Sequence, residues 1–329
     1  MHNATSRLNS AITTGDSSYD PSEAVIYIWN EARWALAQET VVLSSINSAI
    51  NQAQRQYSQQ YASKRIATST LSRNSSLVLL NPFQASSVNI YSFSIGIKPF
   101  ISTVGFVFPG LIQFFFAMAL GGISAKTHIH RRLSTAKNYL TRFVVSRLFT
   151  FIIAISWSGW FYTFAQGRTG SPSSYILMAL DMWMYAMIAF EFHDTCAAFI
   201  PIEFLPITVL SWVIINVTAA AFPIPLKLTF YRIDYAIPSF NCFEIFITIL
   251  TGGSANRLYR NLPVLFAWMI VTGITGVAAN VRRCRFARAN MISEEDGVSC
   301  TSAREDDTTT VDAQEKNVES EFAHEAQGD

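Results

Sequence analysis

The chain has 329 residues, of which half are apolar and only 14% are charged. Soluble domains carry about 25% charged residues, so this composition excludes an ordinary soluble protein and favours a membrane protein. The net charge of +1 conceals a division, because residues 289–329 hold 12 of the 23 acidic residues and residues 1–288 hold 22 of the 24 basic ones. These bases flank apolar stretches, as they do in cytoplasmic loops, and the sequence therefore predicts no nucleic-acid partner.

The N-terminal part of the chain predicts a small helical domain outside the membrane. Asp20 and Glu23 form a capping signal around Pro21, and a helix is expected over residues 20–38. A second, amphipathic helix is expected over residues 42–61 from its helical spacing of apolar residues.

The Ser-rich stretch that follows predicts a loop, with a short strand as an alternative at residues 77–80. Residues 1–95 are interpreted as one partial helical domain.

The rest of the chain is dominated by long apolar stretches. Five of them predict membrane-spanning helices: residues 99–120, 148–165, 175–190, 204–222 and 263–281. Residues 242–253 are apolar apart from Glu244, but are too short to cross a bilayer and suit an interfacial or re-entrant helix. The fold class expected is therefore all-α: a multi-pass transmembrane bundle with five spans, a small outer domain and a disordered acidic tail over residues 289–329.

Basic residues near the spans indicate the orientation. Ten lie in the loop after the first span and after the last span, against six on the opposite side, which favours the first set as cytoplasmic. This places the N-terminal domain outside and the tail inside. Two glycosylation sequons, at Asn3 and Asn74, agree with that side, while a third at Asn216 falls within a predicted span and is not expected to be modified.

An outer domain of about 95 residues needs a means of crossing the membrane. No signal-peptide core opens the sequence. We therefore expect a further span upstream of Met1, absent here because the gene model or isoform is shortened.

Acidic residues within the predicted membrane part are the candidate functional residues. Asp181 lies in the third predicted span, where a carboxylate is costly and usually faces a partner or cavity. It is a candidate substrate-path or proton-coupling acid, and the alternative is an interfacial acid near the outer end of the span. Glu191, His193, Asp194 and Glu203 are expected to be solvated around the next turn, where pairing with the basic loop is an option.

No motif in the sequence predicts catalysis, a cofactor or a metal site. His128 and His130 stand alone in a basic loop, the cysteines lack metal-ligand spacing, and no P-loop occurs, so any ATPase is a separate chain. An enzyme is not expected. In the last predicted span, Thr272 and Gly276 place small residues one turn apart, which favours close packing within the fold or self-association.

Four segments carry a family likeness: NATSRLNSAITTGDSSYDP, NPFQASSV, FPIPLKLTFYRIDYAIPSFNCFEIFITIL and NLPVLFAWMIV. With them the chain resembles the fungal nitrosoguanidine-resistance family of membrane proteins, itself similar to membrane subunits of type-2 ABC exporters and to phage-infection proteins. The resemblance implies one span, an outer domain and five further spans, and this chain has the last two parts.

The same resemblance implies residence in the plasma membrane and a link to drug resistance. The function expected is a transporter-like protein that contributes to export of, or resistance to, toxic small molecules. The alternative is a non-transporting membrane factor that affects lipid distribution or organises membrane partners. No catalytic residues come with the resemblance.

Overall fold

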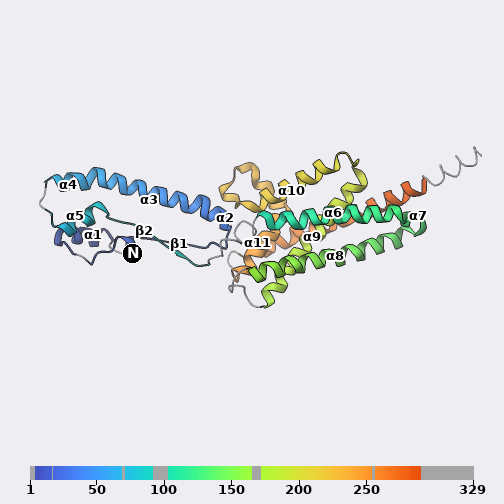
Figure 1. Ribbon diagram of the computed structural model, residues 1–329, viewed down its shortest axis with the longest axis horizontal. Coiled ribbons are helices and arrows are strands. Elements are labelled where there is room, and N and C mark those ends of the chain that lie inside the picture. Colours follow the sequence, from blue (N-terminus) through green and yellow to red (C-terminus); the bar gives the residue numbers. More distant parts are fainter. Residues whose placement is uncertain are drawn as a thin grey trace, which may run out of the picture.

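The computed structural model describes residues 4–16, 18–68, 71–91, 103–164, 172–253 and 256–289. Figure 1 shows an elongated molecule, with a slender N-terminal module at one end and a bundle of apolar helices at the other. The predicted acidic tail from residue 290 on, Asn3 and the first four residues of the predicted span 99–120 lie outside the described residues.

The N-terminal module combines a long helical rod with a small core and a two-stranded sheet. The rod runs through η2 (Gln38–Leu43), α3 (Ser44–Tyr57), η3 (Ser58–Ala62) and α4 (Ser63–Thr68). Its far end meets α1 (Ala4–Thr14) and α5 (Arg73–Leu80). Ile12, Ala62 and Leu79 form the small buried core between them. The sheet pairs β1 (Val25–Trp29) with β2 (Ala85–Asn89) in parallel.

The helix predicted over residues 20–38 is wrong. Its capping signal does form, because Ser22 donates its backbone N–H to Asp20 Oδ1 at 2.9 Å, but only the single turn η1 (Pro21–Glu23) follows. The next residues, VIYIW, are β-branched and aromatic and form β1. Val25 pairs with Ala85, far along the chain, and this pairing prevails over the local helix signal.

Residues 77–80, expected as a loop or strand, belong to the helix α5. The hydroxyl of Ser72 caps this helix by accepting a hydrogen bond from the backbone N–H of Ser75 at 3.1 Å. This N-cap serine is a helix-start signal, and the expectation of a loop or strand did not take it into account. Leu79 faces the core, while Leu77 and Leu80 remain exposed. Only one face of α5 is therefore buried, and the side chains on its other faces remain exposed.

The bundle contains a helix for each predicted span. These are α6 (Gly105–Lys126), α8 (Thr135–Phe164), α9 (Pro172–Phe199), α10 (Leu205–Ala221) and a last helix, Leu258–Ala289. Four described helices are long and apolar enough to cross a bilayer, whereas α10 has only 17 residues and is followed by Pro223. The fifth candidate is the pair η6 (Thr229–Ala236) and α11 (Pro238–Leu250), which bends by 77°. The predicted all-α, multi-pass helical bundle is confirmed.

The bundle helices extend beyond the predicted spans at the end that carries the basic residues. α8 begins at Thr135 rather than at residue 148, α9 runs to Phe199 rather than to residue 190, and the last helix continues to Ala289. The added turns contain charged residues, which hydropathy alone assigns to loops. They remain helical because their charges pair with one another between the helices.

Helix α9 is the centre of the bundle. Of its apolar stretch, 61% is buried inside the protein, against 22–28% in the three other long helices. α6, α8 and α11 all pack along it, as Figure 1 shows. α6, α8 and the last helix thus expose their outer faces, whereas α9 exposes large apolar side chains only near its ends, such as Ile176 and Leu177.

Helix α11 corrects the alternative of an interfacial helix at residues 242–253. It starts at Pro238 and is buried along almost its whole length. Its rings pack closely: Phe243 lies edge-on to Phe106 of α6, and Phe246 lies edge-on to Phe161 of α8. An interfacial helix keeps one face in contact with water, so burial on all sides, together with the 77° bend, agrees with a re-entrant or broken helix.

The N-terminal module is joined to the bundle through Trp34, beside α2 (Ala35–Ala37). The residue has a left-handed backbone, with φ of 63°, and its side chain is buried. Its indole N–H donates to the carbonyl oxygen of Ala220 at 3.2 Å, and its ring lies edge-on to Phe243 at 5.4 Å. Trp34 and Ala37 of the N-terminal module are therefore part of the buried core of the bundle.

Candidate functional site

The most highly charged buried feature is a cluster around Asp194 of α9. Arg142 of α8 donates through Nε to Asp194 Oδ2 at 3.2 Å and also pairs with Asp194 Oδ1. Arg283 of the last helix donates to Asp194 Oδ2 at 2.8 Å. The side chains of Arg142 and Asp194 are only 7% and 4% exposed, so these pairs are shielded from water. Three helices thus meet at one carboxylate.

Glu191 lies one turn before Asp194 and extends this cluster. Arg147 of α8 donates to Glu191 Oε1 at 2.8 Å. The other oxygen, Oε2, lies against Gly276 of the last helix, so closely that a methyl group at position 276 would overlap it. A side chain at position 276 would therefore force the Glu191 carboxylate to move.

This cluster corrects the expectation that Glu191, His193 and Asp194 are solvated loop residues. All three lie within α9 and are buried. The expected pairing with basic residues does occur, but within the bundle, because Arg142 and Arg147 lie in α8 and are turned toward α9. Of the four, Glu203 alone is exposed, in the turn between α9 and α10.

Asp181, the sequence-predicted candidate, lies two and a half turns before Glu191 on α9. It is 5% exposed and faces α11, where the thiol of Cys242 lies 3.4 Å from Asp181 Oδ2. Among the described residues, Asp181 Oδ1 has no hydrogen-bond partner. The side chain is therefore enclosed between α9 and α11 rather than exposed on the surface of the bundle.

A second set of ion pairs lies at the opposite end of the bundle. Glu244 of α11 pairs with Arg260 and, at 3.3 Å, with Arg257. Lys227 Nζ lies 2.6 Å from Asp234 Oδ2, and it also donates to the carbonyl oxygen of Thr218 near the end of α10. Glu244, which interrupts the apolar run of α11, is thus neutralised from the start of the last helix.

The polar residues of the α6–α8 connection tie that connection to the last helix. Asn138 donates to Asn280 Oδ1 at 2.7 Å and lies 2.8 Å from His130 Nδ1. Burial, and then the nearby Arg142 and Arg283 guanidinium groups, lower the pKa of His130 below its ordinary value. In the part of the chain that the structure describes, His128 and His130 belong to no cluster of three or more potential metal ligands.

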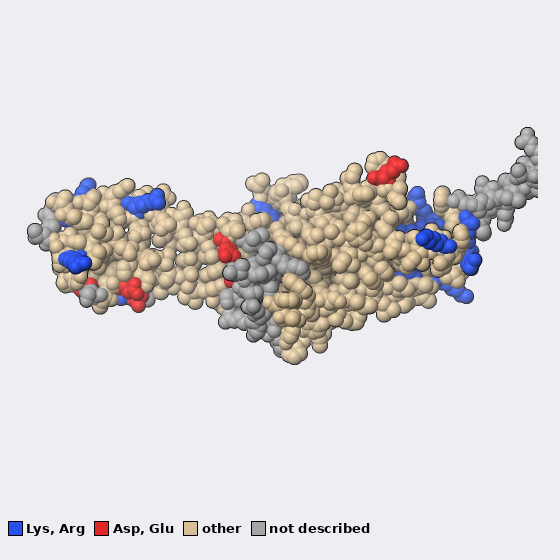
Figure 2. Space-filling view, viewed as in Figure 1, with Lys and Arg blue, Asp and Glu red and all other residues tan. Residues whose placement is uncertain are grey.

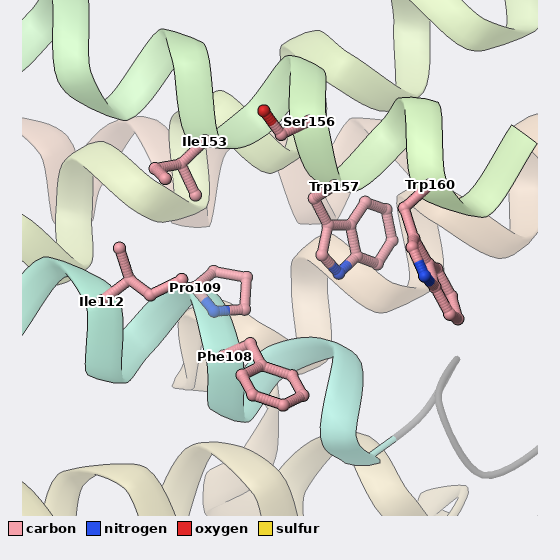
Figure 3. A pocket seen from close by; sticks show the side chains of 7 residues that line it. All are labelled: Phe108, Pro109, Ile112, Ile153, Ser156, Trp157 and Trp160. Atoms are coloured by element: carbon pink, nitrogen blue, oxygen red, sulfur yellow. The ribbon is translucent and has the colours of Figure 1, made fainter.

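An apolar groove runs between α6 and α8 on the outer face of the bundle. Its volume is about 440 Å³. It is lined by Phe108, Pro109 and Ile112 of α6 and by Ile153, Ser156, Trp157 and Trp160 of α8. Figure 3 shows the rings of Trp157 and Trp160 extending from α8 toward α6, with Pro109 and Ile112 of α6 on the other side of the space. The groove forms because α6 and α8 each pack along α9 more extensively than along one another.

The remaining sequence-predicted residues are placed separately. Asn74 is exposed in the first turn of α5, and Asn216 is buried in α10, where its Oδ1 accepts the backbone N–H of Ser239 at 3.3 Å. Thr275 lies 3.2 Å from Thr195 through their hydroxyl oxygens, and Thr272 is buried. The small residues of the last helix thus pack against α9 within the chain.

Sequence reasoning missed the two features that the structure brings together. The sequence contains a weak signal for the buried ion pairs, because Glu191 and Asp194 are three residues apart and would share one face of a helix. Both are indeed buried in α9. The groove had none, because its seven residues are ordinary apolar and aromatic side chains of two separate helices.

Residues 1–274 match the model of a family described as "Protein of unknown function (DUF3533)". No solved structure matches the chain.

Removing the Asp194 carboxylate is expected to destabilise the bundle strongly. Asp194→Asn leaves Arg142 and Arg283 buried without their counter-ion, and breaking a buried pair in this way costs about 3–5 kcal/mol. Unfolding of the purified protein in mixed micelles with rising dodecyl sulfate measures the loss. Glu203→Gln removes an exposed acid at the same end and is the matched control, expected to change the free energy of unfolding by less than about 0.5 kcal/mol. Equal stability of the two variants would contradict the role given to Asp194.

Two glycines of the last helix provide a second test. Gly276→Ala places a methyl group against Glu191 Oε2 and is expected to cost about 1–3 kcal/mol. Gly273→Ala, one turn away, meets no atom within 4 Å and is expected to be neutral or to stabilise the helix by up to about 1 kcal/mol. The same unfolding titration compares them. If Gly276→Ala is as stable as Gly273→Ala, Glu191 does not pack where the structure places it.

Proposed function

The chain belongs to the DUF3533 family, and we propose that it is a transporter-like integral membrane protein that exports small lipophilic molecules and so contributes to resistance to toxic compounds. The observation that carries this proposal is the groove between α6 and α8. Nearly all of its lining is apolar, and Phe108 at its edge is 52% exposed, so the groove faces the lipid side of the bundle. A molecule dissolved in the bilayer reaches it without passing through water.

The size and lining of the groove suit a lipophilic small molecule. Ligand sites commonly have volumes of about 300–1,000 Å³ and are lined by apolar and aromatic side chains with few polar groups. Here the volume is about 440 Å³ and Ser156 is the polar lining residue, its hydroxyl donating to the carbonyl oxygen of Ile152 at 2.8 Å. The site therefore selects for hydrophobic surface and planar rings rather than for a hydrogen-bond pattern.

We propose Asp181 as the substrate-path acid of the same protein. It does not line the groove, but faces Cys242 across the contact of α9 with α11. Separation of α11 from α9 would open this contact, and the 77° bend before α11 supplies a break at which such a movement can occur. The carboxylate would then lie on the path and interact with a cationic substrate or a coupling proton.

This proposal assigns no catalytic residue, cofactor or metal to the chain. Its sequence contains no P-loop, so ATP-driven transport would need a separate ATPase chain. Transport without ATP uses the same groove and the same acid.

A second candidate function is a non-transporting membrane factor that affects lipid distribution or organises membrane partners. The observation that favours it is the close packing of rings from α6, α9 and α11, which meet at Phe106 of α6. Phe106 and Tyr185 lie edge-on at 5.2 Å, and Tyr185 and Phe243 are at most 1% exposed. A bundle with such a core can act as a fixed platform in the bilayer.

We further propose that the N-terminal module lies outside the cell, with the C-terminus in the cytoplasm of a plasma-membrane protein. Figure 2 shows Lys and Arg gathered at the end of the bundle away from this module, which fits the charge bias of cytoplasmic segments. Asn74 would then be available to the glycosylation machinery, as would Asn3.

Efflux of rhodamine 6G, a lipophilic dye, tests the transporter proposal. Ile153→Trp fills the groove and is expected to reduce efflux severalfold in cells with matched amounts of the protein at the surface. Ile152→Trp adds the same ring on the exposed neighbouring position and is the matched control, expected to leave efflux unchanged. Asp181→Asn is expected to reduce efflux at normal surface levels.

If the protein is instead a non-transporting membrane factor, lipid exposure rather than dye efflux should depend on it in the same cells. Phosphatidylserine exposure would change on deletion of the chain while dye efflux stays at the parental rate. Efflux that is unaffected by deletion, together with no dye movement by the purified protein in vesicles under any ion gradient, would reject transport.

Orientation is tested by glycosylation of Asn74. An outside N-terminal module predicts a glycosidase-sensitive increase in mass that Asn74→Gln abolishes or reduces. Asn47→Gln, an exposed asparagine of α3 outside any sequon, is the control and leaves the mass shift intact. Labelling of a cysteine introduced at Ser58 by a membrane-impermeant maleimide in intact cells gives an independent measure. Absence of labelling until the cells are permeabilised would place the module inside.

A further inference from the structure

Three lipid-facing stripes of the bundle end in a cation at the same end. On α8 the exposed residues Leu148, Val144 and Leu140 lead to Lys137. These positions are three or four residues apart and therefore share one helical face. The apolar face of a spanning helix marks the hydrocarbon core, so Lys137 lies at the level where the lipid head groups begin.

The neighbouring helices repeat this arrangement. On α6, Phe115, Ala119 and Ile123 are exposed and lead to the exposed Lys126. On the last helix, exposed apolar residues at positions 270, 274 and 277 lead to Arg285. Three helices thus present a cation directly beyond their lipid-facing apolar surface.

The exposed cations of this end have no acidic partner in the described part of the chain. The basic rim is defined here as Lys126, Arg132, Lys137, Arg282, Arg285 and Arg288, all of them exposed. Asp194 and Glu191, the buried acids nearest to this end, are already paired with Arg142, Arg283 and Arg147. Among the residues that the structure describes, no carboxylate lies within ion-pair distance of the basic rim.

The basic rim is held as one surface. Asn280 of the last helix donates to the carbonyl oxygen of Thr135 at 3.1 Å, and Arg288 reaches the Thr135 hydroxyl at 3.4 Å. Asn138 joins the same two helices, as described above. The cations of the α6–α8 connection and of the last helix are therefore fixed next to one another, where two flexible loops would leave them independent.

From this arrangement we propose that the basic rim binds the phosphate-bearing head groups of anionic phospholipids. The charge is complementary, and the position next to three lipid-facing stripes specifies a lipid rather than a soluble polyanion. Phe286, 68% exposed between the rim arginines, supplies an aromatic side chain at the depth where rings insert into the interface. The site gives the protein a preference for a leaflet rich in anionic lipid, and it does not depend on the transport proposal.

Native mass spectrometry of the full chain in detergent, titrated with palmitoyl-oleoyl phosphatidylserine, tests the proposal. Phosphatidylserine is expected to bind more tightly than phosphatidylcholine with the same chains, and soluble phosphoserine is expected not to compete. The triple variant Arg282→Gln, Arg285→Gln, Arg288→Gln is expected to weaken phosphatidylserine binding at least tenfold, since each cation near a lipid surface contributes about 1 kcal/mol.

The matched control removes three exposed arginines from the N-terminal module instead: Arg55→Gln, Arg65→Gln and Arg73→Gln. It has the same change in net charge and is expected to bind phosphatidylserine as the parent does. A second rim variant, Lys126→Gln, Arg132→Gln, Lys137→Gln, is expected to weaken binding in the same way as the first.

Three results would overturn the proposal. The first is equal binding by parent and both rim variants, and the second is equal binding of phosphatidylserine and phosphatidylcholine. The third is phosphatidylserine binding that appears only after deletion of residues 290–329, because the acidic segment of the chain would then be the occupant of the basic rim.

Discussion

A charged carboxylate in the interior of a membrane bundle is costly unless cations meet it, and Asp194 imposes this requirement on three helices at once. Arg142 arrives on α8 and Arg283 on the last helix, from positions far apart in the chain. The two helices must therefore keep a fixed height relative to α9. Glu191, one turn away, fixes the same axial position of these helices relative to α9, because it pairs with Arg147 and packs against Gly276. The lengths of the long helices, and the location of their ends, follow from this pairing.

The opposite end of the bundle is fixed by different contacts. Glu244 pairs with Arg260, and Trp34 of the outer module packs against Phe243 of α11. Between the two clamped ends lies the contact of Asp181 with Cys242, where the partner of the carboxyl group is a weakly polar thiol. A movement of Trp34 in the N-terminal module would act on α11 directly, and through α11 on Asp181. The structure thus links the N-terminal module to Asp181, a buried acid whose side chain contacts a thiol rather than a cation.

The sequence predicted the helical membrane bundle because hydropathy is additive along the chain and needs no knowledge of neighbours. It failed where structure depends on distant partners. The strand β1 was expected to be helical, because its pairing with β2 is invisible locally. Glu191 and Asp194 were expected in solvent, because their charges were counted without the arginines that cancel them. Asp181 was identified as unusual from its position alone, but its partner Cys242 and its distance from the groove required the fold.

The structure divides the basic residues at this end of the bundle into buried, ion-paired arginines and exposed lysines and arginines. A count of cations near the spans treats Arg142, Arg147 and Arg283 in the same way as Lys137 and Arg285. In the bundle the first three form ion pairs with the buried carboxylates of Asp194 and Glu191. Removing one of these arginines would leave a buried carboxylate without its full counter-charge. The others have no such partner among the described residues and face the level of the lipid head groups. Ion pairs with buried carboxylates remove three cations from the count at each end of the bundle, so the surplus that indicates orientation is unchanged, and its unpaired part is concentrated on one surface. A surface of that kind responds to the charge of the leaflet, whereas the buried arginines do not.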